Sequence, residues 1–187
     1  YNVSSAQVII PAAELSQHIS TAGTEASGTS NMKFVMNGGL IIGTMDGANV
    51  EIAEELGEEN MFIFGERVAG VARCRQAMWD GKRDYVGGRL QRVFDTIKSG
   101  FFGDTSVIHP ILDHLADGGD NYITCFDFYG YIDAQDTVDR TYRDYRKWTE
   151  MAIIGVAKSG KFSSDRTIAE YCSQIWDAKP VPVPHPS

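Results

Sequence analysis

Three short apolar runs stand out in the first part of the chain. They cover residues 8–11, 40–44 and 61–65, and each has the length and the continuous apolar character of a strand that is buried on both faces of a sheet. The first run ends at a proline, which cannot donate a hydrogen bond within a central strand. We therefore expect parallel strands at these three positions.

The segments between these runs are polar and carry signals for helix starts and ends. Residues 14–20 predict a short helix or turn. Within residues 24–39, serine and threonine residues that can cap a helix precede an apolar stretch that ends at Gly38, so a helix of roughly two to three turns is expected. Residues 46–49 predict a turn before a capped helix that reaches about Leu56. Strands that alternate with helices predict an α/β fold with a doubly wound sheet, in which ligands bind at the carboxyl ends of the strands.

Beyond residue 65 the apolar residues follow helical spacing. Leu90, Phe94 and Ile97, for example, mark one face of a helix. The aromatic segment 122–128 fits either a strand or an irregular packed segment, and the proline-rich residues 179–187 fit an extended tail. By the same signals, helices are expected over residues 66–78, 86–99, 106–116, 131–144 and 146–159, and from residue 163 to about residue 176.

Composition and charge narrow the class of protein. The chain has 187 residues and a formal net charge of −8, which argues against nucleic-acid and anionic-membrane partners because both favour lysine and arginine. No apolar run approaches the roughly 20 residues of a membrane span. The three cysteines form no CxxC pair, which is typical of reduced thiols in a cytoplasmic protein. The four histidines show no convincing ligand spacing, so no metal site is expected.

The segment 24–39 carries the candidate chemistry. N–H groups in the first turn of a helix have no intrahelical partner and lie at the positive end of the helix dipole, so the end formed by Gly28, Thr29 and Ser30 can hold a phosphate. Lys33 follows Thr29 by four residues on the same face, and a lysine in apolar surroundings can lose its proton and form a Schiff base. Pyridoxal 5'-phosphate could bridge the two. A solvated lysine is the alternative, and spacing alone favours it.

The specific sequence of this segment favours the cofactor interpretation over the solvated lysine. Residues 25–34, EASGTSNMKF, and residues 37–54, NGGLIIGTMDGANVEIAE, closely resemble the cofactor segment of the glycogen/starch α-glucan phosphorylases. The resemblance continues through GEENMFIFG at residues 57–65 and GKFSSDRTI at residues 160–168, while residues 69–125 match only loosely. The resemblance implies an α/β fold that is part of a Rossmann-like doubly wound domain of a GT-B type glycosyltransferase, followed by C-terminal helices.

The same resemblance implies which residues bind the cofactor. Lys33 matches the lysine that holds pyridoxal 5'-phosphate as a Schiff base. Thr29 and Ser30 match positions whose backbone N–H groups, together with that of Gly28, bind the cofactor phosphate, although many relatives have glycine in place of Ser30. Tyr1 matches a tyrosine that lies near the cofactor.

The substrate residues are also implied by the resemblance. Glu25 matches a carboxylate that accepts hydrogen bonds from sugar hydroxyls, and Ser27 and the Gly28 N–H lie beside it. A glycine is suitable there because the sugar must come close to the main chain. Asp46 and Asn49 are interpreted as residues that only shape the loop.

Enzymes of this family cleave terminal α-1,4-glucosidic bonds of glycogen or starch with inorganic phosphate and release glucose 1-phosphate. In them the 5'-phosphate of the cofactor donates and accepts a proton, a role suited to its second pKa of about 6. The resemblance implies that the chain is the latter half of the C-terminal cofactor-binding domain. In it, residues 1–66 would form the α/β cofactor and sugar site, residues 67–178 a mainly helical part, and residues 179–187 the tail.

The chain starts at Tyr1 without an initiator methionine or a signal-peptide pattern, and we expect it to be a piece of a longer polypeptide. It lacks the family's N-terminal domain and the upstream basic residues that bind the substrate phosphate, so it is expected to be inactive alone. The implied partners are the glucan, inorganic phosphate or glucose 1-phosphate, the rest of the polypeptide, and a second subunit in a full-length homodimer. Two alternatives stay open: a folded, inactive fragment without ligand, and a pyridoxal enzyme of another type such as an aminotransferase.

Overall fold

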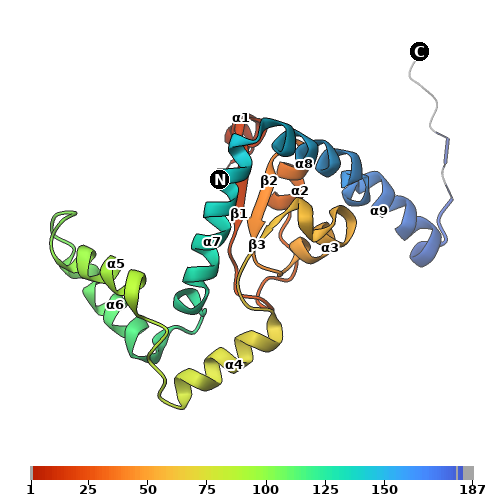
Figure 1. Cartoon of the computed structure of the whole chain (residues 1–187). Coiled ribbons are helices and arrows are strands. Elements are labelled where there is room, and N and C mark those ends of the chain that lie inside the picture. The colour runs from red at the N-terminus through yellow and green to blue at the C-terminus, as the bar shows by residue number, and fades with distance from the viewer. Residues whose placement is uncertain (1, 180, 183–187) are drawn as a thin grey trace.

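The computed structural model describes residues 2–179, 181 and 182. At its centre lies a parallel sheet whose strands β1 (Leu15–His18), β2 (Leu40–Gly43) and β3 (Phe62–Ile63) lie side by side in chain order (Figure 1). In the register of the sheet, Leu15 lies opposite Leu40, and Ile42 lies opposite Phe62. The carboxyl ends of the three strands therefore share one edge of the sheet.

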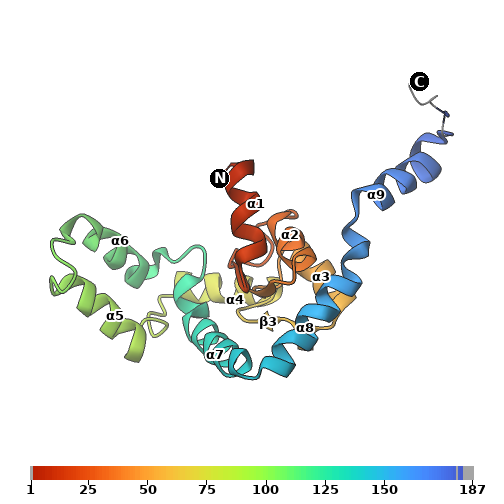
Figure 2. The ribbon, with the colours of Figure 1, turned by 90° about the horizontal axis from the view of Figure 1, so that it is seen from above.

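Both faces of the sheet are covered by helices. Helices α2 (Ser30–Met36) and α3 (Ala48–Leu56) connect the strands and pack on one face, and α7 (Thr124–Arg143) packs on the other. Helix α8 (Tyr145–Lys158) adds Trp148 and Met151 to the core on the α7 side and then passes beside α2 and α3, as Figure 2 shows from above. The buried side chains of β2 alternate between these layers. One core contains Leu40, Ile42, Phe62, Phe64, Ala134, Val138, Trp148 and Met151, and the other contains Val35, Ile41, Ile52, Ala53, Leu56 and Met61.

The predicted strands β2 and β3 and the predicted helices α2 and α3 are confirmed. The prediction for residues 8–11 is wrong, because they belong to helix α1 (Val3–Ala12), where the Asn2 side chain accepts a hydrogen bond from the Ser5 N–H at 2.8 Å. The prediction of a helix or turn over residues 14–20 is also wrong, since β1 lies there. Its polar residues form a strand because the chain pairs with β2 at the edge of the sheet.

A helical extension follows β3 and projects away from the sheet (Figure 1). It contains α4 (Val68–Trp79), α5 (Gly88–Lys98) and α6 (His109–His114). Its core is formed by Met78, Tyr85, Leu90, Phe94 and Leu112 together with Cys125 of α7.

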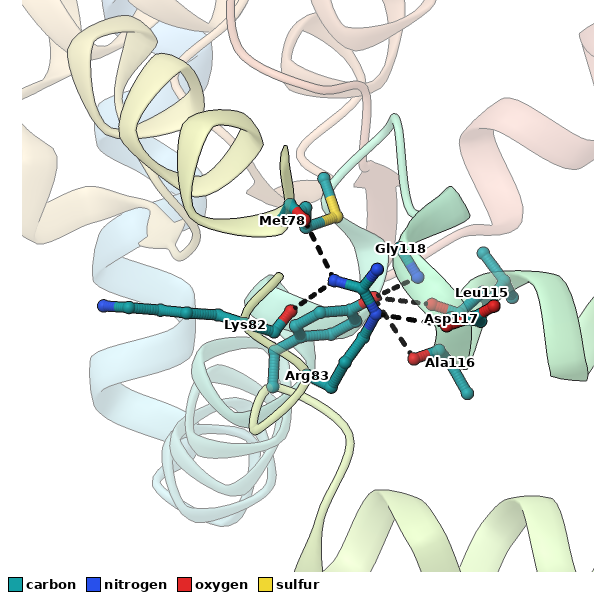
Figure 3. A network of polar contacts seen from close by, with 8 residues as sticks. Met78, Lys82, Arg83, Leu115, Ala116, Asp117 and Gly118 are labelled. Atoms are coloured by element: carbon teal, nitrogen blue, oxygen red, sulfur yellow. Dashed lines mark hydrogen bonds and ion pairs between the residues drawn. The ribbon is translucent and has the colours of Figure 1, made fainter. Parts of the chain in front are cut away.

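Polar contacts fix the base of this extension, as Figure 3 shows. The Arg83 guanidinium donates to the Met78 and Lys82 carbonyl oxygens at 2.9 and 2.8 Å and lies 3.3 Å from the Asp117 carboxylate. The Tyr85 hydroxyl donates to the Leu115 carbonyl at 2.9 Å. These bonds join the end of α4 to the segment after α6.

The aromatic segment 122–128 is neither a strand nor wholly irregular, which corrects the prediction. Helix α7 begins at Thr124, because the buried Asp120 carboxylate accepts the N–H groups of Thr124 and Cys125, each at 2.8 Å. The helix therefore starts seven residues before the predicted residue 131.

Helix α9 (Ser164–Tyr171) runs into the segment Cys172–Trp176, which confirms the predicted end near residue 176. Short helical turns occupy Glu58–Asn60, Ser106–Ile108, Leu115–Gly119 and Ser159–Phe162. The predicted extended tail lies mostly outside the described residues. In the part of the chain that the structure covers, no helix has the length and apolar character needed to cross a membrane.

Candidate functional site

Two loops meet at the carboxyl ends of β1 and β2, and a single carboxylate joins them. Asp46, in the loop after β2, accepts the Gly23 N–H at 2.8 Å and the Glu25 N–H at 2.9 Å, both from the loop after β1. Burial by itself would raise the pKa of Asp46, but hydrogen bonds from the Ser20 side chain and from backbone N–H groups outweigh it and hold the pKa below its ordinary value. Asp46 is therefore an anion that fixes the backbone on either side of Thr24.

A buried amide pair fixes the start of α2 in the same way. The Asn31 side chain donates to the Asn49 side-chain oxygen at 2.9 Å, and the Asn49 amide donates to the Thr44 carbonyl at 2.9 Å. The Thr44 hydroxyl in turn donates to the Ser20 carbonyl at 2.5 Å. Asn31, Thr44 and Asn49 are almost fully buried, so each bond is protected from water. The interpretation of Asp46 and Asn49 as residues that shape the loop agrees with these bonds.

Gly47 allows the two loops to approach closely. It has a φ of 50°, and a Cβ at this position would collide with the Ser27 carbonyl oxygen. That oxygen accepts the Ala48 N–H at 2.5 Å. A side chain at residue 47 would therefore push the loop that carries Ser27 away from α3.

The loops and the start of α2 enclose a polar pocket of about 200 Å³. Four of the predicted site residues lie together in its wall: Glu25, Ser27, Gly28 and Ser30. The remaining wall residues are His18, Ile19, Ser20, Asn31, Asp46 and Asn49.

Lys33 and Thr29 are not among the residues of this wall, although Thr29 lies between Gly28 and Ser30, which are. Thr29 precedes α2, and its carbonyl accepts the Lys33 N–H at 3.4 Å. The side chain of Lys33 is exposed, whereas that of its neighbour Val35 is buried in the core below α2. The apolar surroundings expected for Lys33 are thus not provided by its own helix. Its role as cofactor lysine stays a prediction, and Tyr1 lies outside the described residues.

His18 and Asn31 line the pocket although neither was predicted as a site residue. The His18 imidazole lies 2.9 Å from the Ser16 hydroxyl and packs edge-on against Phe34, with ring centroids 6.4 Å apart. Burial lowers the pKa of His18, which favours the neutral ring. A single histidine at the end of a polar strand carries no pattern from which this position could be predicted.

The pocket combines acceptors, hydroxyl groups and a helix start. Carboxylates and hydroxyls suit the hydroxyl groups of a sugar, and the N–H groups of a first helical turn suit an anion. Among the residues that the structure describes, no three or more histidine, cysteine or acidic side chains are grouped so that they could hold a metal ion.

Comparison of the chain with known proteins identifies its family. The family model described as carbohydrate phosphorylase matches residues 1–178. "Glycogen phosphorylase 2" from Dictyostelium discoideum is 50% identical over an alignment that covers 98% of this chain and 19% of that protein. "Alpha-glucan phosphorylase 2, cytosolic" from Arabidopsis thaliana is 52% identical over an alignment that covers 98% of this chain and 22% of that protein. "Glycogen phosphorylase" from Synechocystis is 50% identical over an alignment that covers 97% of this chain and 22% of that protein. The chain thus spans about a fifth of the length of these relatives, and it belongs to the carbohydrate phosphorylase family.

Proposed function

We propose that this chain is the cofactor-binding part of an α-1,4-glucan phosphorylase. The whole enzyme would release glucose 1-phosphate from glycogen or starch with inorganic phosphate. The observation that carries the proposal is the convergence of Glu25, Ser27, Gly28 and Ser30 in one pocket at the carboxyl ends of parallel strands. The names of the relatives support the same activity.

In this proposal Lys33 carries pyridoxal 5'-phosphate, and the N–H groups of Gly28, Thr29 and Ser30 bind its phosphate. The residues fit the group, because the start of α2 offers N–H groups without intrahelical partners three to four residues before an exposed lysine. The proposal also places Tyr1 beside the cofactor. When bound, the cofactor supplies a phosphate that can exchange a proton near neutral pH, since its second pKa is about 6.

The residues of the chain position the sugar. The Glu25 carboxylate would accept hydrogen bonds from sugar hydroxyls, and the bond from its backbone N–H to Asp46 fixes the place of that residue. Gly28 has a φ of 75°, which favours glycine, and the nearest atom to a Cβ there would be the Glu25 Cγ at 3.8 Å. The backbone at Gly28 is therefore open on the side where a sugar ring must approach.

We further propose that the rest of a longer polypeptide packs against α1 and the free edge of β1. Helix α1 has no buried residue and exposes Val3, Val8 and Ile9. Among the described residues, β1 pairs with β2 alone, which leaves its other edge available to a further strand. The completed unit would be a Rossmann-like, GT-B type domain with residues 1–66 as cofactor and sugar site, 67–178 as helical part and 179–187 as tail. A cytoplasmic homodimer belongs to the same proposal.

The test is a phosphorolysis assay on the polypeptide that contains this chain, with glycogen and inorganic phosphate. We expect release of glucose 1-phosphate by the wild type, and a loss of at least roughly a thousandfold in the variant Lys33→Ala, because the cofactor is then not held. The control Lys158→Ala changes an exposed lysine in the last turn of α8 and should keep full activity. The chain alone should release none. Equal rates for Lys33→Ala and the wild type would refute the proposal.

A further inference from the structure

A second cavity lies at the same edge of the sheet, between the ends of β1 and β3 and the first turns of α7. It has a volume of about 300 Å³. Its wall consists of Ile19, Phe64, Tyr122, Thr124, Asp127, Phe128 and Tyr131, so four of its seven residues are aromatic. Ile19 also lines the polar pocket described above, and the two cavities are therefore neighbours. Ile19 apart, no residue of the second cavity belongs to the polar pocket of the proposed phosphorylase function.

Asp127 supplies the single carboxylate of this wall. One of its oxygens accepts the Glu66 N–H at 3.0 Å. Its other oxygen lies against Gly65, where a Cβ would come within 2.7 Å of it and where the φ of 78° favours glycine. The chain therefore leaves room for the carboxylate beside the backbone at residue 65. In the part of the chain that the structure describes, no cationic side chain forms an ion pair with Asp127.

The charged groups that act on Asp127 are both acidic, namely Glu66 and Asp120. Glu66 comes from the loop before α4, and the buried Asp120 comes from the loop before α7. The guanidinium of Arg73, in α4, lies 3.7 Å from the Glu66 carboxylate, and its positive charge is paired there and not with Asp127 or Asp120. Burial first, and then the charges of Glu66 and Asp120, raise the pKa of Asp127 to about 6. The same three carboxylates add to burial in raising the pKa of the Cys74 thiol.

These features distinguish between classes of ligand. A phosphate or carboxylate ligand would be repelled by Asp127, Glu66 and Asp120. A metal ion would need several ligands, and no such group occurs among the described residues. An organic cation would make two favourable interactions. It would form an ion pair with the Asp127 carboxylate, and its positive charge would be attracted to the faces of the aromatic rings. Its apolar body would lie against Phe64, Phe128 and the two tyrosines.

We propose that this cavity binds an organic cation, in which an amidinium, guanidinium or ammonium group pairs with Asp127 and an apolar or aromatic body packs against the surrounding rings. Two sources share this chemistry. The cation can be a free small molecule, or it can be an arginine or lysine side chain from another part of a longer polypeptide.

The test compares benzamidine, which is cationic at neutral pH, with benzamide, its neutral analogue of nearly equal shape. Isothermal titration calorimetry at pH 7.5 measures both dissociation constants for the 187-residue chain. We expect benzamidine to bind at least roughly tenfold more tightly than benzamide, because benzamidine alone carries the positive charge that pairs with Asp127 and is attracted to the faces of the aromatic rings. Amide NMR shifts should concentrate at the residues of the cavity wall.

Three variants make the test specific. Asp127→Asn keeps the shape and an acceptor for the Glu66 N–H, and it should remove the preference for benzamidine. Asp136→Asn, an exposed residue of the same helix with no ion pair among the described residues, should leave the preference intact. Tyr122→Ala removes an exposed ring and should weaken both probes by roughly threefold or more. If Asp127→Asn proves misfolded by circular dichroism, Tyr122→Ala still provides the test.

Each outcome bears on the proposal. Equal affinity of the wild type for both probes, an unchanged preference in Asp127→Asn, or NMR shifts elsewhere would overturn it. If the chain binds benzamidine but the longer polypeptide does not, a side chain of that polypeptide is the natural cation, and if both bind it, the natural cation is a free ligand. Labelling of Lys33 by pyridoxal 5'-phosphate should be the same in Asp127→Asn and the wild type, so failure here and failure of the phosphorylase proposal are distinguishable.

Discussion

Replacing Asp46 with asparagine tests whether one carboxylate holds the two site loops together. Both oxygens of Asp46 accept backbone N–H groups, at 2.8 Å from Gly23 and 2.9 Å from Glu25. Asparagine has the same shape but keeps one acceptor and presents an NH₂ group to the other N–H. One bond is therefore lost and replaced by a donor–donor contact, and the other loses its charge assistance.

The size of the effect follows from the two bonds. A hydrogen bond to a charged group contributes about 1.5–3 kcal/mol, against about 1 kcal/mol for a neutral one. Gly23 and Glu25 are exposed, so water can hydrate the freed N–H group and reduce the loss. We expect Asp46→Asn to lower the free energy of unfolding by about 2–3 kcal/mol at pH 7.

The dependence on pH identifies the carboxylate as the cause. The pKa of Asp46 in the folded chain lies below its value of about 3.9 in the unfolded chain. Its contribution is therefore fully present above about pH 4 and is lost as the pH falls through the lower, folded pKa. Urea unfolding followed by circular dichroism at pH 7 and at pH 3 should show a difference between wild type and variant that shrinks at pH 3.

The control variant is Asp136→Asn, which changes an exposed carboxylate and should stay within about 0.5 kcal/mol of the wild type. An Asp46→Asn chain as stable as the wild type at pH 7 would refute the reasoning. So would a difference of equal size at both pH values, because the anion would then not be responsible for it.

Three further predictions concern other contacts of the two cavities. Gly47→Ala should lower the free energy of unfolding by about 2–4 kcal/mol in a urea titration, because its Cβ would collide with the Ser27 carbonyl. Gly38 has a φ of 84°, also positive, but a Cβ there would meet no atom within 4 Å, so Gly38→Ala should cost only about 1–2 kcal/mol; equal losses would contradict this. Asn49→Leu should destabilise the chain by about 2–4 kcal/mol, since it leaves the buried Asn31 amide without its acceptor, and the double variant with Asn31→Leu should recover part of that loss in the same unfolding assay. Between about pH 4 and pH 6 the folded chain keeps a proton on Asp127 that the unfolded chain has released. As the pH rises through this range, the free energy of unfolding of the wild type should therefore fall by up to about 3 kcal/mol relative to that of Asp127→Asn, and parallel stability curves for the two proteins would refute the assignment.

The elements that could be predicted from sequence are those whose local pattern has one interpretation. The continuous apolar run at β2 lies between two helices with clear start and stop signals, and its residues face two cores. The prediction for residues 8–11 is wrong because a run of four apolar residues fits a strand or a helix equally well. The polar β1 becomes a strand only through its pairing with β2, which is a contact between distant residues.

The same distinction applies to the site. Glu25, Ser27, Gly28 and Ser30 lie close together in sequence, so a motif that contains them also predicts their proximity in space. Asp46 bonds to Gly23 and Glu25, which precede it by 23 and 21 positions in the sequence. Neither segment contains a local pattern that predicts these bonds. The cap of α7 is hidden for a related reason, since Asp120 precedes the helix by four residues and Ile123 between them has a left-handed backbone with a φ of 51°.

Covalent labelling of Lys33 tests the central claim most directly. The chain is incubated with pyridoxal 5'-phosphate, reduced with borohydride and digested, and the modified peptides are quantified by mass spectrometry, with Lys33→Arg and Lys158→Arg as matched variants. We predict that the pyridoxyl group is concentrated on the peptide of Lys33, that excess inorganic phosphate reduces this label, and that Lys33→Arg alone abolishes it. Labels spread evenly over the exposed lysines, with the same total in Lys33→Arg, would contradict the account.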